Sequence, residues 1–91
     1  MKYLVYWKFK AEDLDKVIEL FMEAEKRSDP ENYPKALSPT YYLHNKFEGI
    51  RIVEVEREEQ IINYHVYYQP YLESTFKSVS NSIDFIKAYM K

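Results

Sequence analysis

Residues 3–9 are apolar at both odd and even positions, and this feature limits the fold of the chain more than any other. The odd positions are Tyr3, Val5, Trp7 and Phe9, and the apolar even positions are Leu4 and Tyr6. Successive side chains of a β-strand point to opposite faces of a sheet. A strand that is apolar on both faces is therefore expected to lie in the centre of a sheet that is covered on both sides.

Residues 14–22 show the spacing of an amphipathic helix. Their apolar members recur every three or four residues, at Leu14, Val17, Ile18, Phe21 and Met22. Acidic residues come before this stripe and Lys26 and Arg27 follow it, as the helix dipole favours. The pattern predicts a helix whose apolar stripe faces the sheet.

The segment from Arg27 to Thr40 is predicted to be a loop, because it contains Pro30, Pro34 and Pro39. Each proline removes a backbone donor and restricts the residue before it. The apolar residues Tyr33 and Leu37 indicate that this loop packs back over one end of the domain.

The rest of the chain alternates between strand and helix patterns. We predict strands at Thr40–Leu43, Ile50–Glu56 and Tyr71–Val79, with a hairpin turn at Asn45–Gly49. A helix is predicted from Arg57 to about Tyr68, because Ile61, Tyr64, His65 and Tyr68 share one face. A short last helix, capped by Ser80 or Ser82, carries Ile83, Ile86 and Met90 on one stripe.

These elements predict one α+β domain spanning residues 1–91, since a chain of 91 residues is too short for two cores. The order β-α-β-β-α-β with a trailing helix is that of a ferredoxin-like unit, in which two helices cover one face of a four-stranded antiparallel sheet. The other face of the sheet would stay bare. The simplest cover is the same face of a second copy, so we expect a homodimer.

Composition disfavours several classes of partner. The net charge of −2 lacks the cationic excess that drives binding to nucleic acid. The chain contains no cysteine, and no apolar run approaches the length of a membrane span, so a cytoplasmic protein is expected. A single glycine, with charge carried by lysine and glutamate, is also typical of thermophile proteins.

Three segments resemble a known family. The opening Met-Lys-Tyr-Leu-Val-Tyr-Trp-Lys-Phe-Lys, the strand Ile52-Val53-Glu54 and the stretch from Tyr64 to Gln69-Pro70-Tyr71 are similar to small uncharacterised domains of the dimeric α/β-barrel superfamily. The superfamily also includes antibiotic-biosynthesis monooxygenases, muconolactone isomerases and haem-degrading enzymes. The resemblance therefore implies a fold and a dimer far better than a chemistry. His65 departs from the family, whose members carry an apolar residue there.

Two titratable residues are candidates for catalysis. Glu54 interrupts an apolar strand on the parity of Ile50 and Ile52, and a carboxylate enclosed in a barrel would have a raised pKa suited to proton transfer. A solvated Glu54 is an equal alternative. His65 lies on the apolar stripe of the second helix and is a candidate base, although a histidine that is simply hydrogen-bonded in the core is the favoured interpretation.

A ligand-binding wall is predicted from Tyr3, Trp7, Ile52 and Tyr68. Trp7 and Glu54 lie on strands expected to be neighbours, so we predict one pocket with an aromatic wall from Trp7, a titrating group from Glu54 and His65 at its margin. Packing in the core is the plainer interpretation of Trp7.

No cofactor and no metal are expected. With Gly49 as the only glycine, the chain has no phosphate-binding loop, dinucleotide fingerprint or nucleophile elbow. His44, His65 and Glu54 match a two-histidine, one-carboxylate metal site in type but not in spacing. Haem would rest on His65 alone, and the third strand has no aromatic platform for RNA.

Two functions from different classes follow. The first is a homodimeric barrel domain that binds a small apolar or aromatic molecule or acts as a structural or regulatory module. The alternative is a cofactor-independent enzyme of the monooxygenase or isomerase type, with Glu54 or His65 moving a proton. A weaker third hypothesis is a protein-interaction module that uses the proline-bearing loop.

Overall fold

The computed structural model describes residues 1–27, 29–44 and 46–90. The helices and strands, in chain order, are β1 (Lys2–Lys8), the 3-10 turn η1 (Ala11–Asp13), α1 (Leu14–Lys26), β2 (Lys35–Ala36), β3 (Tyr41–Tyr42), β4 (Glu48–Glu54), α2 (Glu58–Tyr68), β5 (Glu73–Ser78) and α3 (Ser82–Tyr89). The predicted α+β class is confirmed. Among the described residues, no helix is long and apolar enough to cross a membrane.

The sheet is antiparallel throughout, in the order β2-β4-β1-β5, with β3 also paired to β4. Strand β1 lies between β4 and β5, which confirms the predicted central position of the first strand. It also confirms that this strand pairs with the strand predicted at Ile50–Glu56, which is β4. The predicted four strands are five, because the outer edge of β4 is covered by β2 at one end and by β3 at the other.

Pro39 explains why β4 has two short neighbours instead of one long strand. A proline cannot donate a ladder hydrogen bond. Beside it, Leu37 N–H donates to the Ile52 carbonyl at 2.9 Å, and the Ser38 hydroxyl accepts from Ile52 N–H at 2.9 Å. The prediction that residues 27–40 form only a loop is therefore wrong at Lys35–Ala36, where β2 pairs with Glu54 and Val53.

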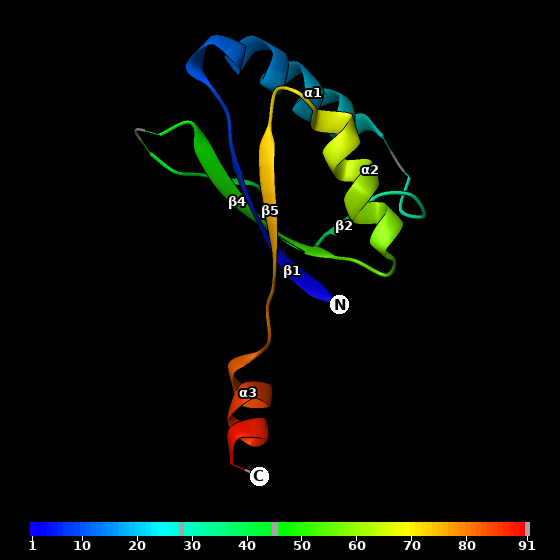
Figure 1. The fold of residues 1–91 in the computed structure, drawn as a ribbon, viewed down its shortest axis with the longest axis vertical. Helices are drawn as coiled ribbons and strands as arrows, with labels where there is room; N and C mark the ends of the chain where they lie inside the picture. Colours follow the sequence, from blue (N-terminus) through cyan, green and yellow to red (C-terminus); the bar gives the residue numbers. More distant parts are fainter. Residues whose placement is uncertain (28, 45, 91) are drawn as a thin grey trace.

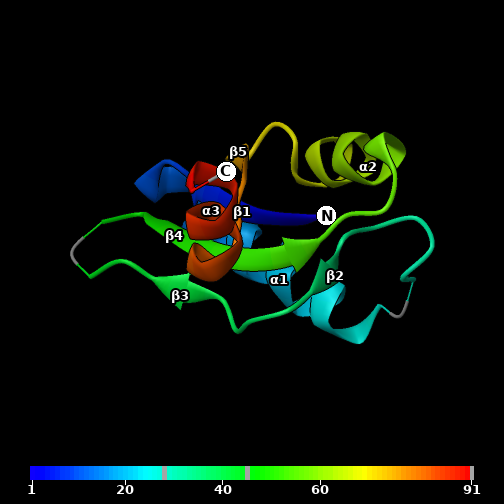
Figure 2. The ribbon, with the colours of Figure 1, turned by 90° about the horizontal axis from the view of Figure 1, so that it is seen from below.

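Both long helices lie on one side of the sheet (Figures 1 and 2). Val5 pairs with Arg51 and Trp7 with Gly49, so the side chains of Val5, Trp7 and Arg51 share the face toward the helices. The opposite face carries Leu4, Tyr6, Ile50 and Ile52, all of them partly exposed in the single chain. We call this second surface the open face.

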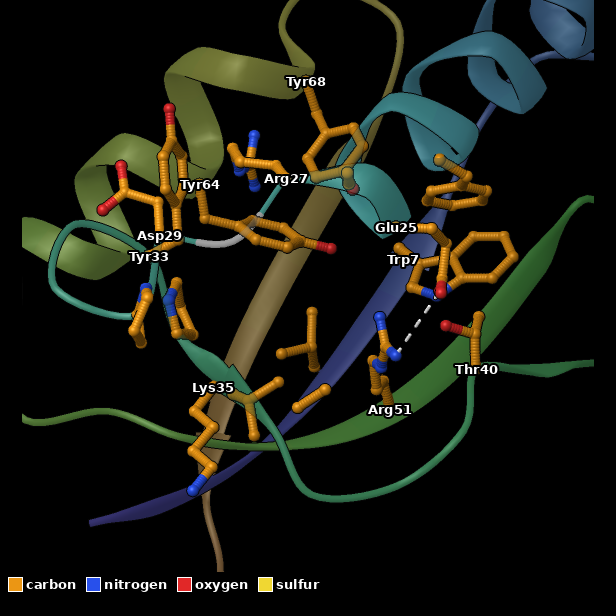
Figure 3. A pocket seen from close by; sticks show the side chains of 17 residues that line it. Trp7, Glu25, Arg27, Asp29, Tyr33, Lys35, Thr40, Arg51, Tyr64 and Tyr68 are labelled. Atoms are coloured by element: carbon orange, nitrogen blue, oxygen red, sulfur yellow. Dashed lines mark ion pairs between the residues drawn. The ribbon is translucent and has the colours of Figure 1, made fainter.

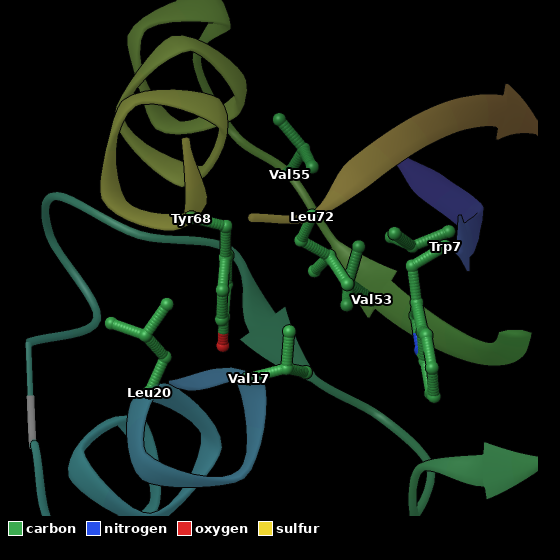
Figure 4. Close-up of a cluster of buried hydrophobic side chains, with 8 residues drawn as sticks. Trp7, Val17, Leu20, Val53, Val55, Tyr68 and Leu72 are labelled. Atoms are coloured by element: carbon green, nitrogen blue, oxygen red, sulfur yellow. The ribbon is translucent and has the colours of Figure 1, made fainter. Parts of the chain in front are cut away.

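The core lies between the sheet and the two helices (Figure 4). It consists of Val5, Trp7, Val17, Leu20, Val53, Val55, Tyr68 and Leu72. From α1 it takes Val17 and Leu20, while Ile18 and Met22 are exposed. The predicted stripe of α1 is thus wrong for Ile18 and Met22, because the sheet covers a band of the helix centred nearer Leu20.

The proline-bearing loop packs back on the domain, as predicted. The buried side chain of Gln60, at the start of α2, donates to the Pro30 and Glu31 carbonyls at 3.1 Å each. Its own carbonyl accepts from Glu56 N–H at 2.8 Å. One buried amide therefore fixes both the loop and the beginning of the helix.

Helix α3 stands apart from the rest of the domain on the end of β5 (Figure 1). Its cap is Asn81, whose side chain accepts from Ile83 N–H at 2.8 Å, so the prediction of Ser80 or Ser82 as the cap is wrong. Its apolar residues, Ile83, Phe85, Ile86 and Tyr89, are all exposed in the single chain, as is Met90 just after it.

Candidate functional site

A pocket of about 330 Å³ lies between the helix-facing side of the sheet, the end of α1, α2 and the proline-bearing loop (Figure 3). This volume is at the lower end of the range for small-molecule sites. Trp7 and Arg51 come from the sheet, Phe21 from α1 and Tyr68 from α2, so four separate elements converge on it. All four elements also contribute residues to the hydrophobic core, which fixes their positions relative to one another.

Aromatic rings form a continuous wall of the pocket. The Trp7 and Phe21 ring centroids are 5.2 Å apart, those of Phe21 and Tyr68 are 5.6 Å apart, and those of Tyr64 and Tyr68 are 4.7 Å apart. Such edge-to-face and tilted pairs hold their rings in fixed orientations. The wall is thus an apolar surface shaped before any ligand arrives.

Arg27, directly after α1, places a guanidinium group in the same pocket. Its Cζ lies 3.5 Å from the centroid of the Tyr33 ring and 4.3 Å from that of Tyr67. Its Nη1 is buried and has no hydrogen-bond partner among the described residues. Cation–π contacts orient this cation, but they do not neutralise it as a carboxylate would.

Arg51 reaches the pocket from β4, where it pairs with the buried Val5. Its Nε donates to the Ser38 carbonyl at 3.0 Å. Its Nη2 lies 3.8 Å from Glu25 Oε1, which is an ion pair but too long for a hydrogen bond. Figure 3 shows this side chain pointing from the sheet toward Glu25. Part of its fork of donors is therefore available.

Two tyrosines complete the site, the partly buried Tyr64 and the buried Tyr68. Burial raises the pKa of Tyr64 to about 12, although the nearby Ser74 hydroxyl and the charge of Arg51 lower it in part. Burial also raises the pKa of Tyr68, and the charges of Arg27 and Arg51 oppose that rise. Both hydroxyls are protonated near neutral pH and can donate hydrogen bonds.

The raised pKa of Tyr64 predicts a loss of stability in alkali. A tyrosine in the unfolded chain ionises near its ordinary pKa of 10.0, whereas folded Tyr64 holds its proton to about 12. The unfolded state loses this proton first, so the contribution of Tyr64 to the free energy of unfolding falls as pH rises through this window and is constant below it. Urea titrations across this range should show a steeper fall for the wild type than for Tyr64→Phe. Parallel curves would contradict the assignment.

The structure brings together only part of the predicted site. Trp7 and Tyr68 line the pocket. Tyr3 faces the helices but packs against Phe76, with ring centroids 6.1 Å apart, and is not in the pocket wall. Ile52 lies on the open face, on the other side of the sheet.

Glu54 does not join Trp7, so the predicted convergence of these two residues is wrong. Glu54 pairs with Lys2 in the register of the sheet, and Trp7 pairs with Gly49, which places the two side chains on opposite faces. The Glu54 carboxylate accepts from the Met1 ammonium at 2.8 Å. The Glu54 side chain is about one-third exposed, so it forms a surface ion pair and does not lie in an enclosed pocket.

His65 is half-buried on α2, with its ring centroid 5.4 Å from that of Phe76. It lies on the helix-facing side of the sheet and Glu54 on the open face, so these two residues cannot act on one substrate within a single chain. In the described part of the chain, no group of three or more histidine, aspartate or glutamate side chains is placed to hold a metal ion.

Arg27 and Arg51 are site residues that the sequence interpretation missed. Arg51 had a usable signal, because it shares the parity of the buried Val53 and Val55 and so interrupts the covered face of its strand. The sequence pattern instead favours Glu54 as the charged residue of the pocket, although Glu54 has the parity of the open face. Arg27 had no such signal, since its position depends on how the loop packs on α2.

These features define an α+β domain with an antiparallel sheet, two helices on one face and an aromatic pocket between the layers. The chain belongs to the family described as Domain of unknown function (DUF3303), which it matches over residues 1–91. None of the curated proteins compared with it matches the chain. Membership of a small uncharacterised family is thus confirmed, whereas the relation to dimeric α/β-barrel proteins stays a prediction.

Proposed function

We propose that this protein is a homodimeric domain that binds a small aromatic molecule in the pocket lined by Trp7, Phe21 and Tyr68. The observation that supports it is the ring wall itself, together with a volume of about 330 Å³. Small-molecule sites are concave and mainly apolar, with a few polar groups that orient the ligand. Here Arg51 and the Tyr64 hydroxyl supply those groups. The enzyme alternative has no comparable support, because Glu54 and His65 lie on opposite faces.

Binding can be tested on the protein as purified. Native mass spectrometry should show a retained small molecule, and adding simple phenols and benzenoid fragments should shift the amide NMR signals of Phe21, Arg27 and Tyr68. Signals of α3 serve as the control, because this helix contributes no residue to the pocket and stands apart from α1 and α2, which do (Figure 1). Fragments that shift no pocket signal, combined with no retained molecule, would overturn the proposal.

The homodimer is proposed from the open face and α3. The open face has an apolar centre formed by Leu4, Tyr6, Ile50 and Ile52, with lysines and glutamates at its margins. A face with both charges at its edges can meet its own copy about a twofold axis. The exposed apolar side chains of α3 need cover as well, and one partner can supply both.

A charge in the centre of the open face is expected to break the dimer. In light scattering at micromolar concentration, the wild type should give twice the 11.1 kDa of one chain, whereas Ile52→Lys should give a monomer. The matched control is Ile62→Lys on α2, where the wild-type side chain is already exposed and faces away from the sheet. A monomeric wild type, or equal masses for both variants, would contradict the interface.

A further inference from the structure

The lining of the pocket carries charge as well as rings, and this points to a narrower class of ligand. Resting on the proposed small-molecule function, we propose that the pocket binds a small aromatic carboxylate with a single negative charge. Arg27, Arg51 and Lys35 contribute three positive charges, and Glu25 and Asp29 contribute two negative ones. The lining therefore has one net positive charge to offer a ligand.

Arg27 is a cation without a counter-ion. No described carboxylate lies within ion-pair distance of it, although other arginines and lysines of the chain are paired. Two tyrosine rings enclose it, and its Nη1 is shielded from water. Charges shielded from water are normally paired, because an unpaired one keeps its desolvation cost. An anion in the pocket beside Arg27 supplies the missing opposite charge.

Arg51 supplies the group that recognises the carboxylate directly. Its Nε is occupied by the Ser38 carbonyl, which holds the guanidinium plane in place. Among the residues that the structure describes, only Glu25 forms an ion pair with Arg51, with Oε1 3.8 Å from Nη2, and the Glu25 side chain is 72% exposed. A ligand carboxylate that binds the Arg51 fork at hydrogen-bond distance would displace this loose surface contact. Glu25 thus competes with the ligand for Arg51.

The aromatic rings of the pocket determine which uncharged part of the ligand fits. The rings of Trp7, Phe21 and Tyr68 line the space for a flat apolar group, and the Tyr64 and Tyr68 hydroxyls remain protonated donors. The single net charge, with Glu25 and Asp29 at the rim, disfavours a dianion such as a phosphate monoester. An aromatic monocarboxylate satisfies both the apolar wall and the charge.

The test compares benzoate with benzamide, which has nearly the same shape but no charge. Amide NMR titrations at neutral pH should place both compounds at the Phe21, Arg27 and Tyr68 signals. Benzoate should bind roughly tenfold or more tightly, as expected for a charge-assisted hydrogen bond. Phenyl phosphate should bind more weakly than benzoate.

Substitutions test whether Arg51 is the residue that binds the carboxylate of the ligand. Arg51→Gln should weaken benzoate at least roughly tenfold while leaving benzamide nearly unchanged. Glu25→Gln should tighten benzoate severalfold, since it removes the competing carboxylate from an exposed position. Lys8→Gln is the matched control, because Lys8 is on the opposite parity from Trp7 and pairs with Glu73. It should leave both affinities unchanged.

The outcomes separate this inference from the proposed function. Equal binding of benzoate and benzamide would overturn the carboxylate assignment and keep the small-molecule site. Equal or tighter binding of phenyl phosphate would replace it with a dianion site. Should Arg51→Gln fail to fold because the Ser38 contact is lost, Glu25→Gln still decides, and unchanged or weaker benzoate binding in it would overturn the role of Arg51.

Discussion

Replacing Gly49 by alanine is expected to destabilise the protein by about 3 kcal/mol, the upper end of the range that is typical when a packed core is overfilled. A Cβ atom at this position would lie 2.5 Å from the Tyr41 carbonyl oxygen and 2.6 Å from Trp7 Cε2. The first neighbour is backbone of the paired strand β3, and the second belongs to a buried ring. Neither can move without separating strands or opening the core. Urea unfolding measures the difference.

A double-mutant cycle tests the cause of this loss. Trp7→Phe removes the part of the ring nearest Gly49, so Gly49→Ala should cost less in the Trp7→Phe background than in the wild type. Ser78→Ala, at an exposed position of β5 on the helix-facing side and so outside the proposed dimer interface, controls for strand propensity and is expected to change stability by less than about 1 kcal/mol. A near-neutral Gly49→Ala would show that the close approach of Trp7 is not required.

Replacing Gln60 by leucine is expected to cost about 2–4 kcal/mol. Gln60 is 2% exposed and is the buried polar residue in the described core. Leucine would leave the Glu56 N–H without its 2.8 Å acceptor and the Pro30 carbonyl without its 3.1 Å donor, whereas the Glu31 carbonyl would keep its hydrogen bond from Arg57. Each group left unpaired in the interior costs about 1–3 kcal/mol, so burying a leucine there does not compensate. Thermal or urea unfolding gives the difference.

Asn63→Ala is the control for Gln60→Leu. Asn63 also links α2 to the loop, through a 2.8 Å hydrogen bond to the Asn32 carbonyl, but that bond is exposed to water. Water replaces an exposed partner, so this variant should lose less than about 1 kcal/mol. Equal losses in the two variants would mean that burial of Gln60 is not what makes it important.

The local elements were predictable from the sequence, because they depend on patterns within a few residues. The predicted strand at Ile50–Glu56 differs from β4 (Glu48–Glu54) by two residues, and the predicted helix at Arg57–Tyr68 is α2 with one extra residue. The sequence predicts a hairpin turn at Asn45–Gly49, because glycine is typical of turns; Asn45 lies outside the described residues, and Gly49 lies inside β4. Glycine is required at this position because the Trp7 ring, which is distant in sequence, lies where a Cβ atom would be.

The site was only half predictable, because a parity rule assigns side chains to two faces without saying which face is covered. Of the residues predicted for a ligand-binding wall, Trp7 and Tyr68 line the pocket, and their role in binding stays a prediction. Glu54 and Arg51 occupy opposite faces of the same strand, and the choice between them depends on the pairing with β1 and on where the helices lie. Those are properties of the whole fold. The sequence alone left both faces of β4 open to interpretation.

The Gln60 anchor also has a kinetic meaning for the pocket. Pro30 and Tyr33, which the anchored loop carries, form part of the pocket wall, so the hydrogen bonds from the Gln60 amide to the Pro30 and Glu31 carbonyls help to hold that part of the wall in place. A ligand inside would favour the closed loop, and an open loop would favour release. The residence time of the ligand and the rate of hydrogen exchange in this loop are then both expected to depend on how often the loop opens.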